Sequence, residues 1–167
     1  NPGTYMVVCK TKIIENSKWT STSTFKVDNR SMKFSESIQD TQYYLKQAVS
    51  RQLISDVPVG AFLSGGLDSS SIVAFAKQLK PDIPCFTIKS VSKKQSHVND
   101  DYFYAKVVAK HLGVELSTVE MDASQIVNDL EKMIWYMDEP LADPAAINVL
   151  YITKKARENG INVLLSG

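Results

Sequence analysis

The chain has 167 residues, of which 44% are hydrophobic and 22% are charged, and its formal net charge is +1. This length suits one domain, and the composition is that of a soluble globular protein. The balanced charge gives no indication of a nucleic-acid or membrane surface, no apolar run approaches membrane-spanning length, and the N-terminus has no signal-peptide pattern. Since neither Cys9 nor Cys85 has the spacing of a metal or redox site, both are expected to be buried, reduced thiols of a cytoplasmic protein.

Residues 1–28 are predicted to be rich in strands. The apolar runs Tyr5–Val8 and Ile13–Ile14 flank the polar Lys10–Lys12, which is typical of a β-hairpin. The Ser/Thr-rich segment Thr20–Thr24 is predicted as a loop or linker. Because two strands alone are marginally stable in water, the hairpin is expected to belong to, or pack on, something larger.

A helix is predicted next, from Ser37 to Ile54, and Ser37 with Asp40 resembles a capping box. Its expected apolar face consists of Ile38, Tyr44, Leu45, Ala48, Val49 and Leu53. A short buried strand, Val59–Leu63, follows this helix.

The segment after that strand combines glycines, hydroxyls and a carboxylate in the order Ser64-Gly65-Gly66-Leu67-Asp68-Ser69-Ser70. It is predicted to join the strand to a helix whose apolar periodicity starts at Ile72 and ends near Pro81. Unpaired N–H groups and the positive dipole end make the start of a helix an anion site, and glycines let the backbone approach closely. The serines can donate hydrogen bonds, and Asp68 can hold a cation that neutralises phosphate charge.

A plain turn with serine caps is the simplest alternative for this segment. Three hydroxyls and two glycines are more than a cap needs, and a carboxylate beside a phosphate site makes sense mainly when a metal ion also binds. The segment is not a mononucleotide P-loop, because no Gly-Lys-Ser/Thr follows the glycines, and it lacks the Gly-x-Gly-x-x-Gly of dinucleotide sites. We therefore interpret it as a different phosphate-binding loop.

The rest of the chain alternates strands and helices. A strand Cys85–Ile88 and a polar loop Ser90–Asn99 are predicted first, followed by a helix that is capped by Asp100 or Asp101 and ends at Gly113. A strand Val114–Met121 and a helix capped by Ser124 come next, and the apolar side of this helix consists of Ile126, Leu130, Met133, Ile134 and Met137. The last predicted elements are a helix Ala145–Asn159 and a strand Ile161–Leu165. This alternation predicts an α/β fold, a parallel sheet with helices on both faces, preceded by the short β-hairpin. Ligands of such sheets bind outside the strand carboxyl ends, so the Ser64–Ser70 loop, Ile88 and Ser166-Gly167 are expected to meet at one edge.

The segment Met137–Pro144 is predicted to be a stiff acidic loop ahead of the helix that starts at Ala145. Helix entry explains two of its residues, with Asp143 as the N-cap and Pro144 at the first helical position. It leaves Asp138 and Glu139 without a structural explanation.

The Ser64–Ser70 segment resembles the pyrophosphate-binding loop of the N-type ATP pyrophosphatases. With Ser55-Asp56-Val57-Pro58-Val59-Gly60 immediately upstream, the chain is similar to the glutamine-hydrolysing asparagine synthetases, which Asn1–Tyr5, Asp138–Pro144 and Leu165–Gly167 also resemble. The resemblance implies a fold like that of the adenine nucleotide alpha hydrolases, of the HUP or Rossmann-like type. It also implies that residues 1–30 are a remnant of an N-terminal glutaminase domain with its linker, and that residues 31–167 are the N-terminal part of an ATP-dependent synthetase domain.

An ATP-dependent amide ligase is the function that this resemblance implies. The side-chain carboxylate of aspartate would attack the α-phosphorus of ATP, giving β-aspartyl-AMP and pyrophosphate, and ammonia derived from glutamine would then displace AMP to give asparagine. ATP and Mg²⁺ are the implied cofactors, with Asp68 as the metal ligand, and Asp138 and Glu139 would lie on the substrate side. The implied ATP- and pyrophosphate-binding residues are Leu63, Ser64, Gly65, Gly66, Leu67, Asp68, Ser69, Ser70, Ile88, Ser166 and Gly167.

Two other functions stay open at this point: another adenylating amidotransferase, β-lactam synthetase-like or peptide-cyclising, and a non-enzymatic nucleotide-binding domain. The glutaminase nucleophile, for which Cys9 should not be mistaken, and a second metal-binding loop are absent from the sequence, so this fragment alone is expected to be inactive. No nucleic-acid or membrane partner is expected, and the oligomeric state, including a homodimer, is left open.

Overall fold

The computed structural model describes residues 3–19, 33–90, 101–121, 123–137, 139, 141, 143 and 145–167. The chain divides into two compact units, Asn1–Ser37 and Ile38–Gly167. Across the described ranges, no helix combines the length and the apolar character that crossing a membrane requires.

The first unit contains the predicted antiparallel hairpin. Strand β1 (Thr4–Cys9) pairs with β2 (Lys12–Lys18), and the Trp19 N–H donates to the Gly3 carbonyl oxygen at 3.0 Å where the hairpin opens. Apolar side chains of both strands are exposed in this unit, among them Met6, Val8, Ile13 and Ile14. Cys9 is exposed as well, so the expectation that both thiols are buried is wrong for Cys9, because a two-stranded hairpin has no second layer to cover it.

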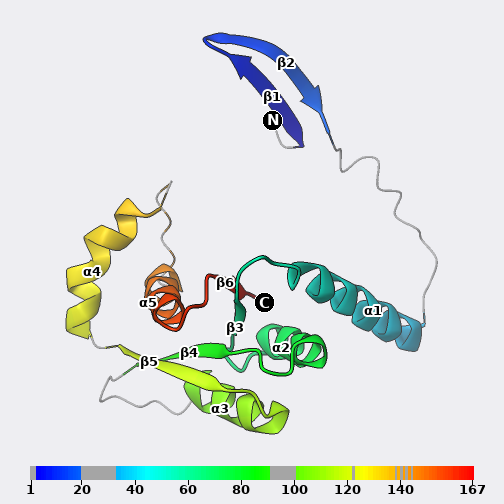
Figure 1. Ribbon diagram of the computed structural model, residues 1–167, viewed down its shortest axis with the longest axis vertical. Coiled ribbons are helices and arrows are strands. Elements are labelled where there is room, and N and C mark those ends of the chain that lie inside the picture. The colour runs from blue at the N-terminus through cyan, green and yellow to red at the C-terminus, as the bar shows by residue number, and fades with distance from the viewer. Residues whose placement is uncertain are drawn as a thin grey trace. The chain divides into compact units, whose positions relative to one another are not determined.

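The second unit is built on a four-stranded parallel sheet, which confirms the predicted fold class. The spatial order is β5 (Leu116–Met121), β4 (Cys85–Ser90), β3 (Val59–Phe62) and β6 (Val163–Leu165). Helices α2 (Leu67–Leu79) and α3 (Asp101–Leu112) cover one face, and α5 (Ala145–Glu158) covers the other (Figure 1).

Successive strand residues serve two hydrophobic cores, one on each face of the sheet. Leu63 and Cys85 lie in a core that includes buried residues of α2, α3 and the C-terminal half of α1 (Phe34–Gln52). The next residue of β4, Phe86, is 1% exposed and packs with Ile152 and Ala156 of α5 on the opposite face. This alternation follows from the two-residue repeat of a strand, and it explains why both faces of a central strand must be apolar.

The N-terminus of α1 differs from the prediction. The helix begins at Phe34 after Lys33, whose carbonyl oxygen accepts from the Ser37 N–H at 3.1 Å and whose own N–H donates to the Glu36 carboxylate at 3.2 Å. The predicted capping box of Ser37 and Asp40 is therefore wrong, since Ser37 already lies in the first turn. Glu36 reaches back to the cap residue as the acidic member of a capping box does.

The apolar face of α1 is narrower than predicted. Val49 is buried, and Leu45 and Leu53 pack against the core. Tyr44 is 68% exposed, and Ile38 and Ala48 are exposed too. Only the C-terminal half of the helix reaches the sheet, so the pattern predicted more buried residues than the fold uses.

Other element boundaries shift by a few residues. Helix α2 starts at Leu67 rather than Ile72, which places Asp68, Ser69 and Ser70 in its first turn. Ser124 lies inside α4 (Ala123–Trp135), so it is not the N-cap. Strand β4 runs to Ser90, whereas β5 and β6 begin at Leu116 and Val163, each two residues later than predicted. The predicted linker Thr20–Thr24 and the loop from residue 91 to Asn99 lie outside the described residues.

Burial makes Cys85 chemically inert. Its side chain is fully buried in β4, and burial raises the pKa of the thiol from 9.0 to about 12. At pH 8, iodoacetamide should therefore alkylate exposed Cys9 in the native chain and leave Cys85 unmodified, whereas both thiols should react in denaturant. Peptide mass spectrometry measures this directly. Equal native labelling of both thiols would contradict the burial.

The raised pKa of Cys85 also predicts a pH dependence of stability. Because the thiol ionises at lower pH in the unfolded chain, the free energy of unfolding should fall as the pH rises from about 9 to about 12, and it should fall less in Cys85→Ala.

Candidate functional site

The carboxyl ends of three strands meet at one edge of the sheet. The register pairs Ala61 of β3 with Cys85 of β4 on one side and with Leu165 of β6 on the other. Continuing this register sets Ile88 level with Ser64, and Gly167 level with Leu63. The structure thus brings together the loop after β3, Ile88 and Ser166-Gly167, as the topology predicts (Figure 1). The strand order reverses between β3 and β6, and ligands of open α/β sheets bind outside such a switch point.

A short turn connects β3 to α2, and the N-terminus of α2 has no side-chain cap. The Leu63 N–H donates to the Phe86 carbonyl oxygen at 2.9 Å, so the ladder continues one residue past β3. Gly66 is the N-cap residue of α2, and no side chain caps the helix. The first N–H groups of a helix have no acceptor within it, so this start offers aligned donors and the positive dipole end to an anion.

Two serine hydroxyls tie the turn to the first turn of α2. The Oγ atoms of Ser64 and Ser69 are 3.0 Å apart, and the Ser69 Oγ also accepts from the Ser64 N–H and donates to the Gly66 carbonyl oxygen, both at 3.3 Å. The Ser64 Oγ accepts from the Gly66 N–H at 3.3 Å. These bonds fix the turn against the first turn of α2.

Ser70 adds a hydroxyl in the same turn of α2. Its Oγ is buried and has no hydrogen-bond partner within the part of the chain that the structure describes. A buried hydroxyl without a partner costs free energy, so the site has an unused donor and acceptor next to the loop.

Two close backbone approaches shape the loop. Gly65 has a φ of +82°, and a Cβ on it would lie 2.5 Å from the backbone nitrogen of Ala105 in α3. A Cβ on Gly167 would lie 2.6 Å from the backbone nitrogen of Ser69. Atoms cannot approach so closely, so the geometry accommodates only glycine at both positions.

The other residues predicted to bind ATP differ in which of their groups a ligand can reach. Leu63 is 1% exposed and its side chain belongs to the core, which leaves only its main chain for a ligand. Ile88 is partly buried and packs on the α5 side of the sheet. Leu67, Ser166 and Gly167 are exposed at the same edge.

Asp68 is an exposed carboxylate in the first turn of α2. Among the residues with described positions, no three His, Cys, Asp or Glu side chains gather into a metal site. Magnesium is commonly held by one or two carboxylates together with phosphate oxygens and water. A lone exposed carboxylate in the first turn of a helix suits an ion that arrives with a phosphate ligand, rather than a preformed metal centre.

Part of the acidic loop is explained by helix entry. The Asp143 Oδ1 accepts from the Ala145 N–H at 2.8 Å, which confirms Asp143 as the N-cap of α5. Glu139 is exposed, whereas Asp138 and Pro144 lie outside the described residues. The predicted role of Glu139 on the substrate side stays a prediction.

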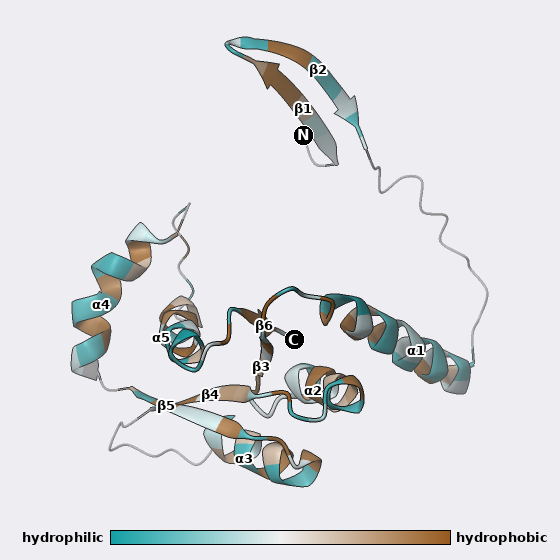
Figure 2. Ribbon diagram, in the orientation of Figure 1, coloured by the Kyte–Doolittle hydropathy of each residue, from teal (hydrophilic) through white to brown (hydrophobic). Residues whose placement is uncertain are grey.

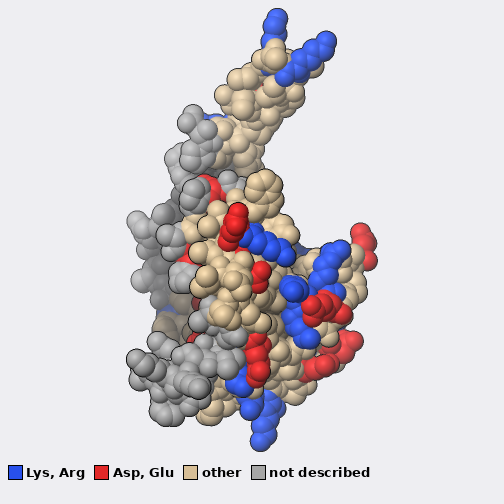
Figure 3. Space-filling view, turned by 90° about the vertical axis from the view of Figure 1, so that its left-hand side faces the viewer, with Lys and Arg blue, Asp and Glu red and all other residues tan. Residues whose placement is uncertain are grey.

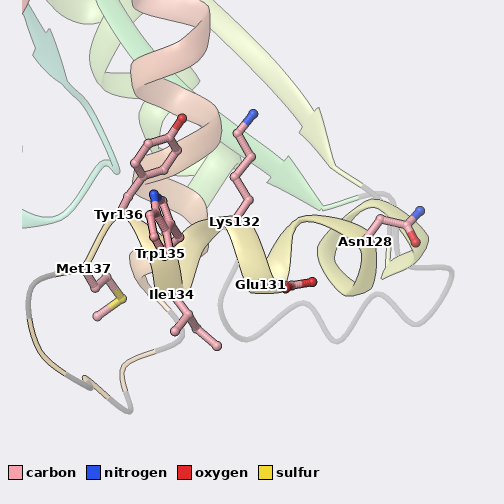
Figure 4. Close-up of a pocket in the computed structure, with 7 residues that line it drawn as sticks. All are labelled: Asn128, Glu131, Lys132, Ile134, Trp135, Tyr136 and Met137. Atoms are coloured by element: carbon pink, nitrogen blue, oxygen red, sulfur yellow. The ribbon is translucent and has the colours of Figure 1, made fainter.

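A hollow that the sequence did not indicate lies at the end of α4, with a volume of about 750 Å³. It is lined by Asn128, Glu131, Lys132, Ile134, Trp135, Tyr136 and Met137. Figure 4 shows Trp135 and Tyr136 next to each other at the C-terminal end of the helix, with Asn128 nearer its start. All of its lining comes from this helix and the two residues after it, so the hollow is separate from the edge where the strands converge.

The apolar side predicted for α4 is only partly covered, since Ile126, Met133 and Met137 are half-buried and its other two residues are exposed. Apolar and polar residues alternate along the helix (Figure 2), yet Leu130 is 46% exposed and Ile134 is 57% exposed. The helix contacts α5, where the Tyr151 hydroxyl donates to the Asp129 carboxylate at 2.6 Å. Within the described residues, α4 therefore buries part of its predicted apolar side and leaves the rest exposed.

Charges of both signs are mixed on the surface. On the face that Figure 3 shows, Lys and Arg side chains are interspersed with Asp and Glu. Lys89 and Glu120, on neighbouring strands, form an exposed ion pair of 2.8 Å, and the hydrogen bond from Lys89 lowers the pKa of Glu120. Exposed pairs of this kind contribute little to stability.

Comparisons with known proteins place these features among relatives. A family model described as asparagine synthase matches residues 40–167. Glutamine-hydrolysing asparagine synthetase 1 of Bacillus subtilis is 38% identical over 135 residues, which cover 81% of this chain and 20% of that protein. A putative glutamine-hydrolysing asparagine synthetase of Mycobacterium tuberculosis is 35% identical over 124 residues, covering 74% and 18%. Amidase chyE of Penicillium rubens is 28% identical over 146 residues, covering 79% and 21%.

The chain therefore spans about a fifth of the length of the curated relatives that it matches. Among solved structures, NMN synthetase from Francisella tularensis has a TM-score of 0.49 at 16% identity, covering 79% of this chain and 53% of that one. Glutamine-dependent NAD⁺ synthetase from Acinetobacter baumannii, in complex with ADP, has a TM-score of 0.47 at 20% identity, covering 81% and 26%.

Proposed function

This chain belongs to the asparagine synthase family, and from that membership we propose that it forms the nucleotide-binding part of an ATP-dependent ligase that makes an amide. The observation that carries the proposal is the uncapped start of α2, which lies at the switch point between β3 and β6 beneath the Ser64-Gly65-Gly66 turn. Such a start presents N–H and O–H donors where parallel sheets bind their ligands.

The proposed reaction of the complete protein is the synthesis of asparagine. The side-chain carboxylate of aspartate attacks the α-phosphorus of ATP, pyrophosphate leaves, and β-aspartyl-AMP forms. Ammonia released from glutamine then attacks the acyl carbon and loses a proton. AMP leaves with the electron pair of the bond between the acyl carbon and the phosphate oxygen. Several relatives are named as glutamine-hydrolysing asparagine synthetases, which supports this choice of substrates. Since the chain spans about a fifth of those proteins, we propose that it binds the nucleotide without completing the reaction alone.

The loop's proposed task is to stabilise the pyrophosphate leaving group. The N–H groups at the start of α2 and the hydroxyls of Ser64, Ser69 and Ser70 would bind phosphate oxygens, with the two hydroxyls that now bond to each other exchanging partners. The N–H donors are already fixed by the helix and need little reorganisation as charge develops on the leaving group. Asp68 would hold Mg²⁺, which neutralises phosphate charge when bound.

The other predicted site residues complete the proposal. The main chain of Leu63, the side chain of Ile88 and the Ser166-Gly167 segment would hold adenosine, because the register sets them level with the loop. Asp138 and Glu139 would face the amino-acid substrate.

We also propose a domain boundary near residue 30. Residues 1–30 would be the end of a glutaminase domain with its linker, and residues 31–167 the first part of the synthetase domain. The separate compact unit Asn1–Ser37 and the family match from residue 40 support a boundary in this region. A cytoplasmic location and the oligomeric state stay predictions.

Another adenylating amidotransferase is the second candidate, because relatives in two fungi, Penicillium rubens and Gibberella zeae, are named amidases at 28% identity. The phosphate loop would serve both candidates equally, so the acceptor distinguishes them.

A pyrophosphate-release assay tests these candidates. The complete protein would receive ATP, Mg²⁺ and ammonia with either aspartate, glutamate or a β-amino acid as the acceptor. We expect release that depends on aspartate and matches AMP formation. Pyrophosphate release with another carboxylate alone would support the second candidate. ATP binding without pyrophosphate release in the presence of any of these acceptors would support a non-enzymatic nucleotide-binding domain.

A further inference from the structure

We propose that Ala105 of α3 is a positioning residue for the phosphate loop, here Ser64–Gly66, an inference that rests on the proposed function of that loop. The contact is at Gly65. A Cβ on Gly65 would lie 2.5 Å from the Ala105 backbone nitrogen and 2.5 Å from the Tyr104 carbonyl carbon. The loop backbone therefore lies directly against the α3 backbone, and neither side can yield by a side-chain rotation.

The side chain of Ala105 acts on this contact through the core. Ala105 is 0% exposed and belongs to the same core as Leu63, which precedes the loop, and Val73, which lies in the helix after it. Protein cores are closely packed, so a larger side chain at this position must displace its neighbours. Displacement of α3 is transmitted to Gly65 without an intervening side chain.

The first turn of α2, which follows the loop, has little room to move when α3 is displaced. Gly167 lies against the first turn of α2, where a Cβ on it would be 2.6 Å from the Ser69 backbone nitrogen and 2.7 Å from the Asp68 carbonyl carbon. The loop is therefore held by α3 at Gly65, and the helix turn that follows it is held by Gly167. The size of residue 105 thereby sets the orientation of the loop donors.

Ala109 provides a matched control. It lies one helical turn later on α3, is 5% exposed and belongs to the same core. The nearest atoms to a Cβ on Gly65 belong to Tyr104 and Ala105, not to Ala109. Ala109→Val therefore overpacks the same core one turn away from the contact, and it is expected to move the backbone at Gly65 less than Ala105→Val does.

The test compares Ala105→Val and Ala109→Val in the 167-residue chain by two measurements. The first is hydrogen–deuterium exchange of the Ser64, Gly66 and Ser70 amides, each of which has an acceptor within the loop or first turn. The second is the affinity for magnesium pyrophosphate by calorimetry. We expect Ala105→Val to raise exchange at these amides about tenfold and to weaken binding about tenfold, whereas Ala109→Val changes both less than about twofold.

Equal effects of the two substitutions on loop exchange would overturn the proposal, because they would show general overpacking. Should Ala105→Val fail to fold, Ala105→Ser against Ala109→Ser makes the same comparison with one added atom, and faster loop exchange only in the former is expected. If the unsubstituted chain does not bind magnesium pyrophosphate, the proposed function fails, while the exchange comparison still decides the role of Ala105.

Discussion

Asp68→Ala is expected to abolish magnesium-dependent release of pyrophosphate from ATP by the complete protein and to leave the fold intact. Asp68 is exposed in the first turn of α2, so its removal exposes no core and costs at most about 1 kcal/mol of helix-dipole stabilisation. The same carboxylate is the proposed magnesium ligand, and loss of one well-placed electrostatic group typically lowers turnover by about 10²–10³-fold or more. A coupled pyrophosphate assay and a thermal unfolding curve measure the two effects.

Asp82→Ala is the control for Asp68→Ala. Asp82 is also exposed, but it precedes β4 and therefore lies at the opposite, amino-terminal edge of the sheet. Its removal should leave pyrophosphate release unchanged. Normal release by Asp68→Ala would rule out Asp68 as the metal ligand.

The two glycines of the loop are expected to respond very differently to alanine. Gly65→Ala places a Cβ at a φ of +82° and 2.5 Å from the backbone of α3, so the free energy of unfolding should fall by about 1–3 kcal/mol. Gly66 has a φ of −68°, and the nearest atom to its added Cβ is the Ser64 Oγ at 3.4 Å. Gly66→Ala should therefore cost less than about 1 kcal/mol, chiefly because alanine is a poorer N-cap residue.

Urea unfolding of both glycine variants makes this comparison, since the exchanges are chemically identical and adjacent. Magnesium pyrophosphate affinity should fall in Gly65→Ala, because the loop must move to accept the side chain. Equal destabilisation by the two substitutions would contradict the contact between Gly65 and α3.

The fold could be predicted because its strands are distinctive. Cys85–Ile88 and Val59–Leu63 are almost entirely apolar, with buried Thr87 as the polar exception, and a sheet covered on both faces buries such runs. The start of α2 was missed for a physical reason. Leu67 is 83% exposed, so apolar periodicity gives no sign that the helix has begun at that residue.

The sequence predicts which residues lie at the site, but it does not predict how they are arranged. The topology brings Ser64, Ile88 and Gly167 to one edge, and the sequence contains the residue types for a phosphate loop. The bond between the Ser64 and Ser69 hydroxyls and the contact of Gly65 with Ala105 depend on tertiary packing. Alanine at position 105 carries no local signal of such a role, because buried alanines are common in helices.

The position of β6 has a consequence for how the protein folds. Leu165 pairs with Ala61, and nearly the whole second unit separates them in the chain. Parallel pairings between distant segments close long loops before they yield any stabilising contact, and they slow folding. During synthesis the central strand β3 must therefore wait with one edge unpaired until β6 has left the ribosome. The phosphate loop, which has Gly167 at its side, would be among the last parts of the second unit to reach its final structure.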